Sequence, residues 1–388
     1  MTDKLKVAII SSPNAGLGHY TAHLINPLSE LCYPKFITYP QVDSMGVVST
    51  QFTDTFMKRY IKWPRFALDD KDAQSIVDVA SYLKSRNINI VNIHIGTTIK
   101  QKINYFIALV LYCKQINKTK FVFTLHDVLP FNHDRKLIHL LKVFYGLADE
   151  FIVGNRREYQ KLVRYYKVPQ NKIHTIKHGI YNLFDNNLYD RRIARSFLNL
   201  DQSKPVVLFF GFLKEFKGFD YLVKAAKIVK KKHPDLVVYV ASGLKYAPKE
   251  LVKRSLNLVH KLNLNDTFIL NLNYLDVNDI EMVFKASDIV VLPYTNASQS
   301  GVMMMSVGFK KPVVISDVFA EKDWIANKAG LVAKNKDFKD YAQKINYLID
   351  NPEKATEFGL NGYKYAMKHL NWKDIAKEYF QVFKKTAA

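Results

Sequence analysis

The chain has 388 residues, of which 48% are apolar, and it contains 25 Phe, 23 Tyr and 3 Trp. This length exceeds what one compact core needs and predicts two domains, while the apolar content excludes a disordered chain. The 57 Lys and Arg residues outnumber the 35 Asp and Glu residues and give a net charge of +22, spread along the chain. Such a charge favours polyanionic partners: nucleoside diphosphates, nucleic acid or an anionic membrane surface.

Cys32 and Cys113 are the only cysteines. Two thiols exclude a disulfide framework and a four-thiolate zinc site, and they favour a reducing compartment. The apolar run at residues 7–10 begins too early to leave room for a signal peptide. The longest uninterrupted apolar stretch, residues 105–113, is about half of what a bilayer crossing needs. We therefore expect a cytoplasmic protein that is soluble or peripheral on the cytoplasmic face of a membrane.

Apolar runs of strand length alternate with helical patterns in the first half of the chain. The expected strands are residues 6–10, 88–95, 121–125 and 150–153, and the expected helices between them include 18–31, 102–117 and 135–145. Strand–helix alternation of this kind predicts a parallel sheet covered on both faces.

The pattern fades over the polar residues 182–203, which hold one helical patch at 190–198, and then begins again. The second set of expected strands is 205–210, 236–241, 267–270, 289–292 and 312–315. Two doubly wound α/β domains follow from this repeat, with residues 1–187 in the first and 188–371 in the second. The last helix, around residues 372–385, comes after the second sheet is complete.

Ligands of open parallel sheets bind beyond the carboxyl ends of the strands, so each strand-to-helix junction is a candidate site. At the first junction Gly16 and Gly18 allow close approach of a phosphate to a helix N-terminus, although a tight turn without a ligand explains them as well. At the next, His126 and Asp127 directly follow a buried strand. His126 could be a base, an orienting group or a hydrogen-bond donor to a sugar, and Asp127 could cap the next helix. The alternative is a capping pair without a ligand.

Glycines also mark the junctions near the domain boundary and at the start of the second domain. His178 precedes Gly179 in what is a polar turn or a site. Gly211 opens a loop that carries Lys214 and Lys217, two ammonium groups that could neutralise a departing diphosphate. The alternative is that both lysines form part of a solvated surface.

The fifth junction has more polar residues than a helix cap requires. A strand ends at Tyr294, and a small polar turn then opens an apolar helix. The unpaired N–H groups at such a helix start suit an anion or a polyhydroxylated ligand, and the alternative is a simple N-cap. The residues of this turn and helix start are Ser298, Gln299, Ser300, Gly301 and Val302.

In order and spacing these junctions resemble the retaining glycosyltransferases of the GT-B fold, of the family 4 type. The resemblance covers nearly the whole chain and is strongest at residues 210–222, 286–294 and 298–314, with a further match at 173–179. It implies two Rossmann-like domains that face each other across a cleft, with the C-terminal helix, residues 372–388, crossing back to the first domain.

The resemblance also implies the role of each candidate residue. The catalytic residues would be His126, beside the reacting sugar, and Lys214 and Lys217, on the phosphates. Acceptor-side residues would be His19, Asp127 and His178. The donor-binding residues would be Gly16, Gly18, Gly211, Tyr294, Ser298, Gln299, Ser300, Gly301, Val302 and Ser306.

Two departures from the family pattern concern the donor. The family commonly has two glutamates where this chain has Ser298 and Ser306, and a basic residue where it has Phe212, which leaves Lys214 as a substitute. This Ser-Gln-Ser-Gly variant indicates altered sugar and ribose contacts. No Asp-x-Asp motif is present in residues 188–371, the expected donor domain, so no metal and no other cofactor are expected. Without a carboxylate nucleophile, front-side attack with retention, implied by the family, fits better than double displacement.

The resulting hypothesis is transfer of a hexose-type sugar from a UDP- or GDP-linked donor to a glycan or lipid-linked acceptor. Basic and aromatic residues interleave at residues 56–66, and residues 100–120 and 135–145 add basic helices with apolar faces. This composition suits an anionic membrane surface. A solvated surface explains it as well, and nucleic acid binding is the least favoured alternative. The alternative functions are a nucleotide-sugar epimerase and a non-catalytic nucleotide-sugar-binding protein.

Overall fold

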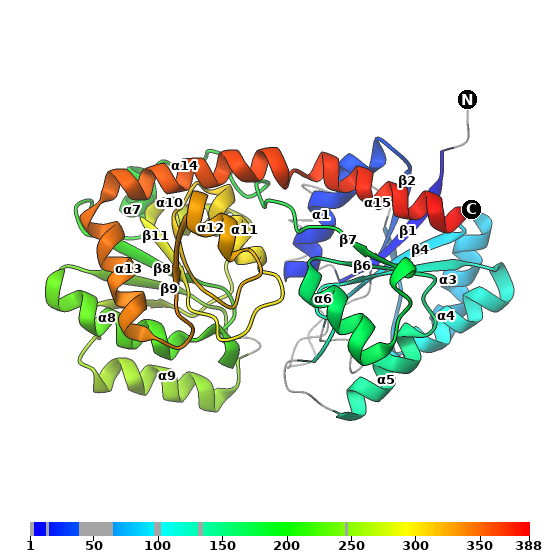
Figure 1. The fold of residues 1–388 in the computed structure, drawn as a ribbon, viewed down its shortest axis with the longest axis horizontal. Helices are drawn as coiled ribbons and strands as arrows, with labels where there is room; N and C mark the ends of the chain where they lie inside the picture. Colours follow the sequence, from blue (N-terminus) through cyan, green and yellow to red (C-terminus); the bar gives the residue numbers. More distant parts are fainter. Residues whose placement is uncertain (1–3, 13–14, 39–64, 97–101, 131–134, 245–246) are drawn as a thin grey trace. The chain divides into compact units, whose positions relative to one another are not determined.

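The computed structural model describes residues 4–12, 15–38, 65–96, 102–130, 135–244 and 247–388. The chain divides into two compact units, each with its own sheet (Figure 1). The first unit is Met1–Gly179 with Leu370–Ala388, and the second is Ile180–His369. Every described strand pair is parallel, so both units have the doubly wound α/β architecture that the strand–helix alternation predicts.

The sheet of the first unit has the strand order β3-β2-β1-β4-β5-β6-β7. Its strands are β1 Lys6–Ser11, β2 Tyr33–Thr38, β3 Arg65–Ala67, β4 Ile90–Ile95, β5 Lys120–Leu125, β6 Glu150–Val153 and β7 Ile173–Thr175. All six residues of β4 are buried, because helices cover both faces of the sheet. The strand order reverses between β1 and β4, which makes this point the expected ligand crevice.

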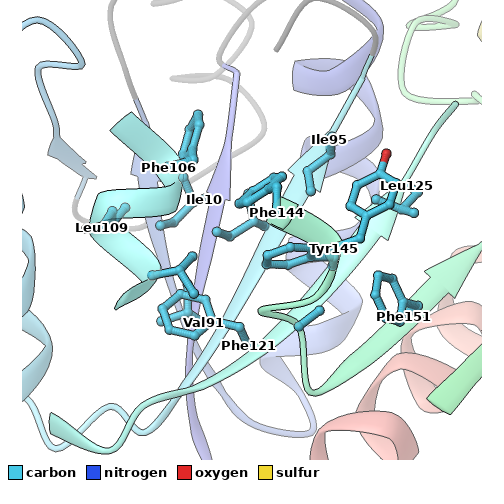
Figure 2. Close-up of a cluster of buried hydrophobic side chains, with 14 of the residues drawn as sticks. Ile10, Val91, Ile95, Phe106, Leu109, Phe121, Leu125, Phe144, Tyr145 and Phe151 are labelled. Carbon is cyan, nitrogen blue, oxygen red and sulfur yellow. The ribbon is translucent and has the colours of Figure 1, made fainter. Parts of the chain in front are cut away.

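Helices of the first unit pack aromatic side chains onto its sheet. They are α1 Ala15–Ser29, α3 Gln74–Ser85, α4 Ile103–Asn117, α5 Arg135–Tyr145, α6 Arg156–Lys161 and α15 Trp372–Ala387. Phe144 and Tyr145 of α5 point into the cluster that Figure 2 shows, and the Phe144 ring lies 4.6 Å from that of Phe123. Helix α15 packs against α1, β4 and β5, so the last segment of the chain completes this unit.

The sheet of the second unit has the order β10-β9-β8-β11-β12-β13, with the reversal between β8 and β11. The strands are β8 Val206–Phe210, β9 Val237–Ala241, β10 Phe268–Asn271, β11 Ile289–Leu292, β12 Val313–Ser316 and β13 Gly330–Ala333. The helices are α7 Arg191–Phe197, α8 Phe219–Lys232, α9 Lys249–Lys261, α10 Val277–Ala286, α11 Gly301–Gly308, α12 Lys322–Lys328, α13 Phe338–Asp350 and α14 Pro352–His369. Within the described ranges, no helix is both long and apolar enough to cross a membrane.

One predicted boundary differs in a way that matters for the site. Helix α1 begins at Ala15 and not at Gly18, so Gly16 and Gly18 lie in the first turn of the helix and not in a loop before it. The sequence pattern also missed three short or mixed strands, β2, β3 and β13. Strand β2 contains Pro34 and Lys35, which obscure its apolar alternation.

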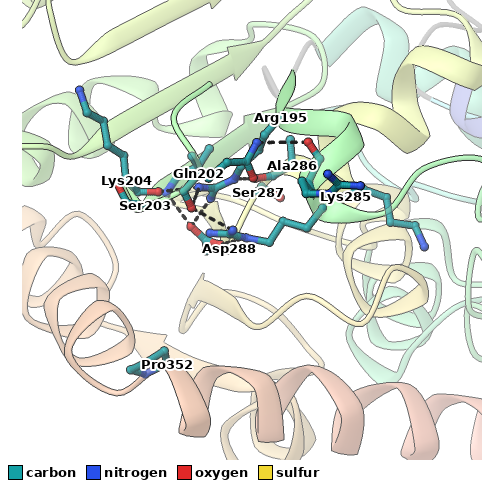
Figure 3. A network of polar contacts seen from close by, with 12 residues as sticks. Arg195, Gln202, Ser203, Lys204, Lys285, Ala286, Ser287, Asp288 and Pro352 are labelled. Carbon is teal, nitrogen blue, oxygen red and sulfur yellow. Dashed lines mark hydrogen bonds and ion pairs between the residues drawn. The ribbon is translucent and has the colours of Figure 1, made fainter. Parts of the chain in front are cut away.

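A buried arginine connects helix α7 to the first residue of β8 and to the residues just before β11 (Figure 3). The Arg195 side chain is fully buried and donates to the Asp288 carboxylate at 2.7 Å, and this carboxylate also accepts from the Val206 amide at 2.8 Å. Four backbone carbonyls accept further bonds from the guanidinium: those of Ala286, Asp201, Gln202 and Lys204. Because a buried charge destabilises a fold unless it is fully paired, these contacts all have to form together.

We expect Arg195→Met to lower the free energy of unfolding of the second unit by about 3–5 kcal/mol, because Asp288 and the four carbonyls would lose a buried partner. Arg191→Met is the matched control. Arg191 bonds the same carboxylate at 3.0 Å from an exposed position, so its loss should cost about 1 kcal/mol or less. Urea denaturation of both variants measures the difference, and equal losses would contradict it.

Candidate functional site

Two strand-to-helix loops of the second unit are bound to each other beyond the ends of β8 and β11. The Thr295 amide donates to the Phe216 carbonyl at 2.7 Å. The Lys217 ammonium donates to the Tyr294 hydroxyl at 2.8 Å and lies 4.9 Å from the centre of the same ring. Because β8 and β11 are parallel neighbours, their loops leave the same edge of the sheet and can make these contacts.

Glycine is required where the two loops touch. Gly218 has φ +66°, and a Cβ built there would lie 1.9 Å from the Pro293 carbonyl oxygen. Gly211 has φ +99°, and its Cβ would lie 2.8 Å from Lys217 Nζ and 3.4 Å from Val302. The Lys217 ammonium, the Gly211 backbone and the first turn of α11 are therefore neighbours.

This arrangement has the chemistry of an anion site. Lys217 is only 8% exposed, so its charge acts in a partly dehydrated environment. Helix α11 begins at Gly301, and its first amides carry the positive end of the helix dipole. The structure thus brings together Gly211, Lys217, Tyr294, Gly301 and Val302 from the predicted donor-binding and catalytic residues.

The serines of this junction have partners within their own helix. Ser300 is the N-cap of α11 and accepts from the Met303 amide at 3.2 Å. The Ser306 hydroxyl is fully buried and donates to the Val302 carbonyl at 2.7 Å. Ser300 is therefore an N-cap, as the alternative interpretation of this turn expects. A contact of Ser300 or Ser306 with the nucleotide-sugar donor stays a prediction. Ser298 is buried and Gln299 is half-buried on the approach to the helix.

Lys214 lies on the same loop as Lys217, at the start of a single 3-10 turn, Glu215–Lys217. Its side chain is half-buried, and its carbonyl accepts from the Lys217 amide at 2.9 Å. The Phe212 ring, which stands where the family has a basic residue, packs 5.7 Å from Tyr274. Lys214 as a phosphate ligand is a prediction that these contacts leave open.

The first unit places several histidines around one tyrosine of α1. The ring of Tyr20 makes edge contacts with His94, His126 and His178 at centroid distances of 5.5, 4.7 and 5.1 Å. Trp372 of α15 contacts the same ring at 4.8 Å. The predicted residues His126 and His178, which are 52 positions apart in sequence, thus lie on one cluster with His94.

His126 follows β5, beside the end of β4. Its amide donates to the Ile95 carbonyl at 2.9 Å, and its Nε2 lies 3.3 Å from Nδ1 of His94. The turn after it is fixed from α6, because the Val128 amide donates to the Glu158 carboxylate at 3.0 Å. Asp127 is half-buried in this turn. The predicted capping of the next helix by Asp127 depends partly on residues 131–134, which lie outside the described residues.

His178 and Gly179 pack directly on the C-terminal helix. The His178 Nδ1–H donates to the Gly179 carbonyl at 2.7 Å. A Cβ at Gly179 would lie 2.4 Å from the Trp372 ring, so only glycine allows this approach. His178 therefore contributes to the cluster from the segment that follows β7.

His19 and the two glycines lie in the first turns of α1. The His19 carbonyl accepts from His23 Nδ1 at 2.7 Å, and the His23 ring lies 5.6 Å from that of Trp372. Gly16 is exposed, and a Cβ built on it meets no atom within 4 Å. A ligand could therefore approach the Gly16 backbone without a steric clash. A phosphate contact there stays a prediction.

Burial keeps these imidazoles neutral. It lowers the pKa of His19, His23 and His94 to about 3 and that of His178 to about 4. The pKa of His126 is lowered well below its usual value, first by burial and then by His94 and His178. At neutral pH the cluster can therefore donate and accept hydrogen bonds without carrying charge.

Sequence reasoning missed several members of this cluster. His94 is the second-last residue of a strand that was expected, so a search of the strand-to-helix junctions could have included it. Tyr20 and His23 lie within an expected helix, where their direction was not evident. Trp372 and Tyr379 also contact Tyr20, through a ring contact and a hydroxyl–hydroxyl bond. The sequence could not indicate these contacts, because they join positions more than 350 residues apart. Among the described residues, no group of three or more His, Cys, Asp or Glu side chains is arranged to hold a metal ion.

Comparison with solved structures defines the fold class. Anabaena HepE in complex with UDP-glucose aligns with a TM-score of 0.77 at 16% identity, covering 99% of both chains. Sucrose-phosphate synthase from Thermosynechococcus elongatus aligns with a TM-score of 0.74 at 18% identity, covering 98% of this chain and 99% of that one. The chain therefore has the GT-B fold of these proteins.

The sequence comparisons give the family. Residues 190–365 match the family described as glycosyl transferases group 1. D-inositol 3-phosphate glycosyltransferase 2 from Catenulispora acidiphila is 25% identical over 244 residues, which cover 62% of this chain and 56% of that protein. Alpha-maltose-1-phosphate synthase from Mycolicibacterium smegmatis is 23% identical, covering 58% and 59%. The matches span less than two thirds of these relatives.

We expect the first unit to lose stability as the pH falls from about 6.5 toward 4. In the unfolded chain His23, His94 and His178 take up protons near pH 6.5, whereas the folded state resists protonation down to pKa values of about 3, 3 and 4. Each such histidine should lower the free energy of unfolding by about 1.4 kcal/mol per pH unit in this window.

Urea denaturation at pH 7 and pH 5 measures this loss. The variant His178→Gln should show a smaller pH dependence than the wild type, whatever its stability at pH 7. His139→Gln, on the exposed side of α5, is the control and should keep the wild-type dependence. An identical pH dependence in all three proteins would contradict the expectation.

Proposed function

We propose that this protein is a retaining glycosyltransferase that moves a hexose-type sugar from a nucleoside-diphosphate sugar to a glycan or lipid-linked acceptor without a metal ion. The observation that carries the proposal is the position of the Lys217 ammonium, held by Tyr294 beside Gly211 and the first turn of α11. These groups form a preorganised site for the two phosphates of the donor. HepE, which shares the fold, is described in complex with UDP-glucose, and this supports a UDP-linked donor over a GDP-linked one.

In the proposed reaction the bond between the anomeric carbon and the β-phosphate oxygen breaks, and its electron pair stays with the phosphate. Lys217 and the α11 amides stabilise the negative charge that develops there. The acceptor hydroxyl attacks the same face of the sugar and passes its proton to the departing phosphate. Retention rests on the family resemblance, and independence of metal rests on the lack of an Asp-x-Asp motif in residues 188–371. We assign His126 to the sugar and His19, Asp127 and His178 to the acceptor side.

Release of UDP from UDP-glucose, with water as the acceptor, tests this assignment. Lys217→Met should lower the rate of release by about 10²–10³-fold, because one preorganised cation no longer faces the leaving group. Lys253→Met, an exposed lysine of α9, is the matched control and should leave the rate unchanged. Full activity of Lys217→Met would remove Lys217 from the mechanism.

A thermal-shift screen with UDP-, GDP-, ADP- and CDP-linked sugars separates the alternatives. A donor that raises the melting temperature and is hydrolysed supports the glycosyltransferase. A donor that raises the melting temperature but is never hydrolysed or transferred supports the non-catalytic binding protein. Interconversion of the free nucleotide sugar supports the epimerase.

We further propose that helices α4 and α5 face an anionic membrane that carries the acceptor. These helices pack on each other and expose large apolar side chains: Leu111 and Ile116 are 51% and 52% exposed, and Val143 is 59% exposed. Lys136 and Lys142 are exposed on the same helix as Val143. Basic residues around apolar ones are typical of surfaces that bind anionic lipids. Residues 56–64 of the basic and aromatic segment 56–66 lie outside the described residues.

Co-sedimentation with vesicles tests the membrane assignment. The double variant Lys136→Glu, Lys142→Glu should bind vesicles containing phosphatidylglycerol more weakly, by about 1 kcal/mol for each lysine near the surface. The control, Lys253→Glu with Lys261→Glu on α9, changes the net charge equally and should bind like the wild type. Equal binding by all three proteins, or binding by none, would exclude these helices as the contact.

A further inference from the structure

A chain of hydrogen bonds connects the end of β4 to His126. Asn92 Nδ2 donates to the Val122 carbonyl at 3.0 Å and to Thr124 Oγ1 at 2.9 Å. Its Oδ1 lies 2.9 Å from Nε2 of His94, and Nδ1 of His94 lies 3.3 Å from Nε2 of His126. Asn92 is fully buried and His94 is 2% exposed, so their partners are protein groups.

The hydrogen-bond donors and acceptors of Asn92, His94 and His126 can be arranged in only one way while both imidazole rings are neutral. The Val122 carbonyl can only accept, which fixes the amide group of Asn92 and turns its Oδ1 toward His94. Because an amide oxygen can only accept, His94 must carry its proton on Nε2, and its Nδ1 is then an acceptor. His126 must therefore donate from Nε2, and its ring lone pair is on Nδ1.

The surroundings favour the neutral rings that this order requires. Tyr20 contacts both His94 and His126, and the Tyr379 ring from α15 stacks 6.4 Å from that of His94 at an angle of 18°. The two tyrosine hydroxyls bond each other at 2.9 Å. The other titratable group that acts on His126 is His178, whose positive form would oppose its protonation.

We propose that Asn92 and His94 are positioning residues that hold His126 as its Nε2-protonated tautomer. His126 can then contact a substrate only through Nδ1. This nitrogen would accept a hydrogen bond from a hydroxyl group of the sugar or of the acceptor substrate. The proposal deepens the glycosyltransferase function and, for its catalytic consequence, rests on it. The Tyr379 ring lies nearly parallel to that of His94, so the C-terminal helix forms part of its surroundings.

The tautomer is measurable without any activity. In full-length protein labelled with ¹⁵N-histidine, two-bond ¹H–¹⁵N spectra at neutral pH should show His126 protonated on Nε2, its signals being assigned by comparison with His126→Gln. His94→Gln should keep this pattern, because a glutamine amide can donate to Asn92 and accept from His126. His94→Phe, which offers neither group, should give a mixture of tautomers. A wild-type His126 protonated on Nδ1 would overturn the proposal.

UDP release from UDP-glucose tests the catalytic consequence. His94→Phe should lower kcat by about tenfold to a hundredfold with little change in the donor KM, the range found when an orienting partner is lost, and His94→Gln should recover most of the rate. Equal rates in all three proteins would overturn the positioning role while leaving the proposed function in place. If the wild type neither binds nor hydrolyses any donor, the proposed function fails, and the spectra still decide the tautomer.

Discussion

Parallel alignment of the strands is the constraint on which both candidate sites depend. Parallel neighbours send their following loops to one edge of the sheet, so groups that are distant in sequence meet there. In the second unit this brings Lys217, after β8, to Tyr294, after β11. In the first unit it brings His94 at the end of β4 beside His126 after β5. Neither pair lies close in sequence, and each depends on the register of two neighbouring strands.

The two sites handle charge in opposite ways. Around Lys217 a cation is kept in a partly dehydrated place, beside a helix start of the same sign, which suits a ligand with negative charge. Around Tyr20 the imidazoles are buried without charge, which suits hydroxyl groups that must be oriented and not neutralised.

Much of the fold was predictable, because buried parallel strands are short apolar runs that alternation with helices makes visible. Strands β6 and β11 have the bounds that the sequence indicates. The junctions around Lys217 and the start of α11 could be located for a similar reason: glycines, lysines and a helix start are local features. Ser306 shows the limit of such reasoning, because its hydroxyl bonds its own helix, which the sequence does not reveal.

The histidine cluster was only partly predictable, for a different physical reason. His126 and His178 stand at junctions, whereas Asn92 points from within a strand and acts through His94. Trp372 and Tyr379 of α15 pack against the rings of Tyr20 and His94. No local sequence pattern indicates where such a distant helix will pack. Nonlocal packing is therefore the main source of what the sequence left open.

The place of helix α15 has a consequence for how the protein forms during synthesis. The Tyr20–Tyr379 bond joins residues 359 positions apart, and the second unit is made entirely between them. When the ribosome has finished the first sheet, its layer around Tyr20 still lacks Tyr379 and Trp372. The first unit therefore begins folding first and finishes last, and until then a nascent chain exposes uncovered aromatic and imidazole surface, the kind of intermediate that chaperones recognise.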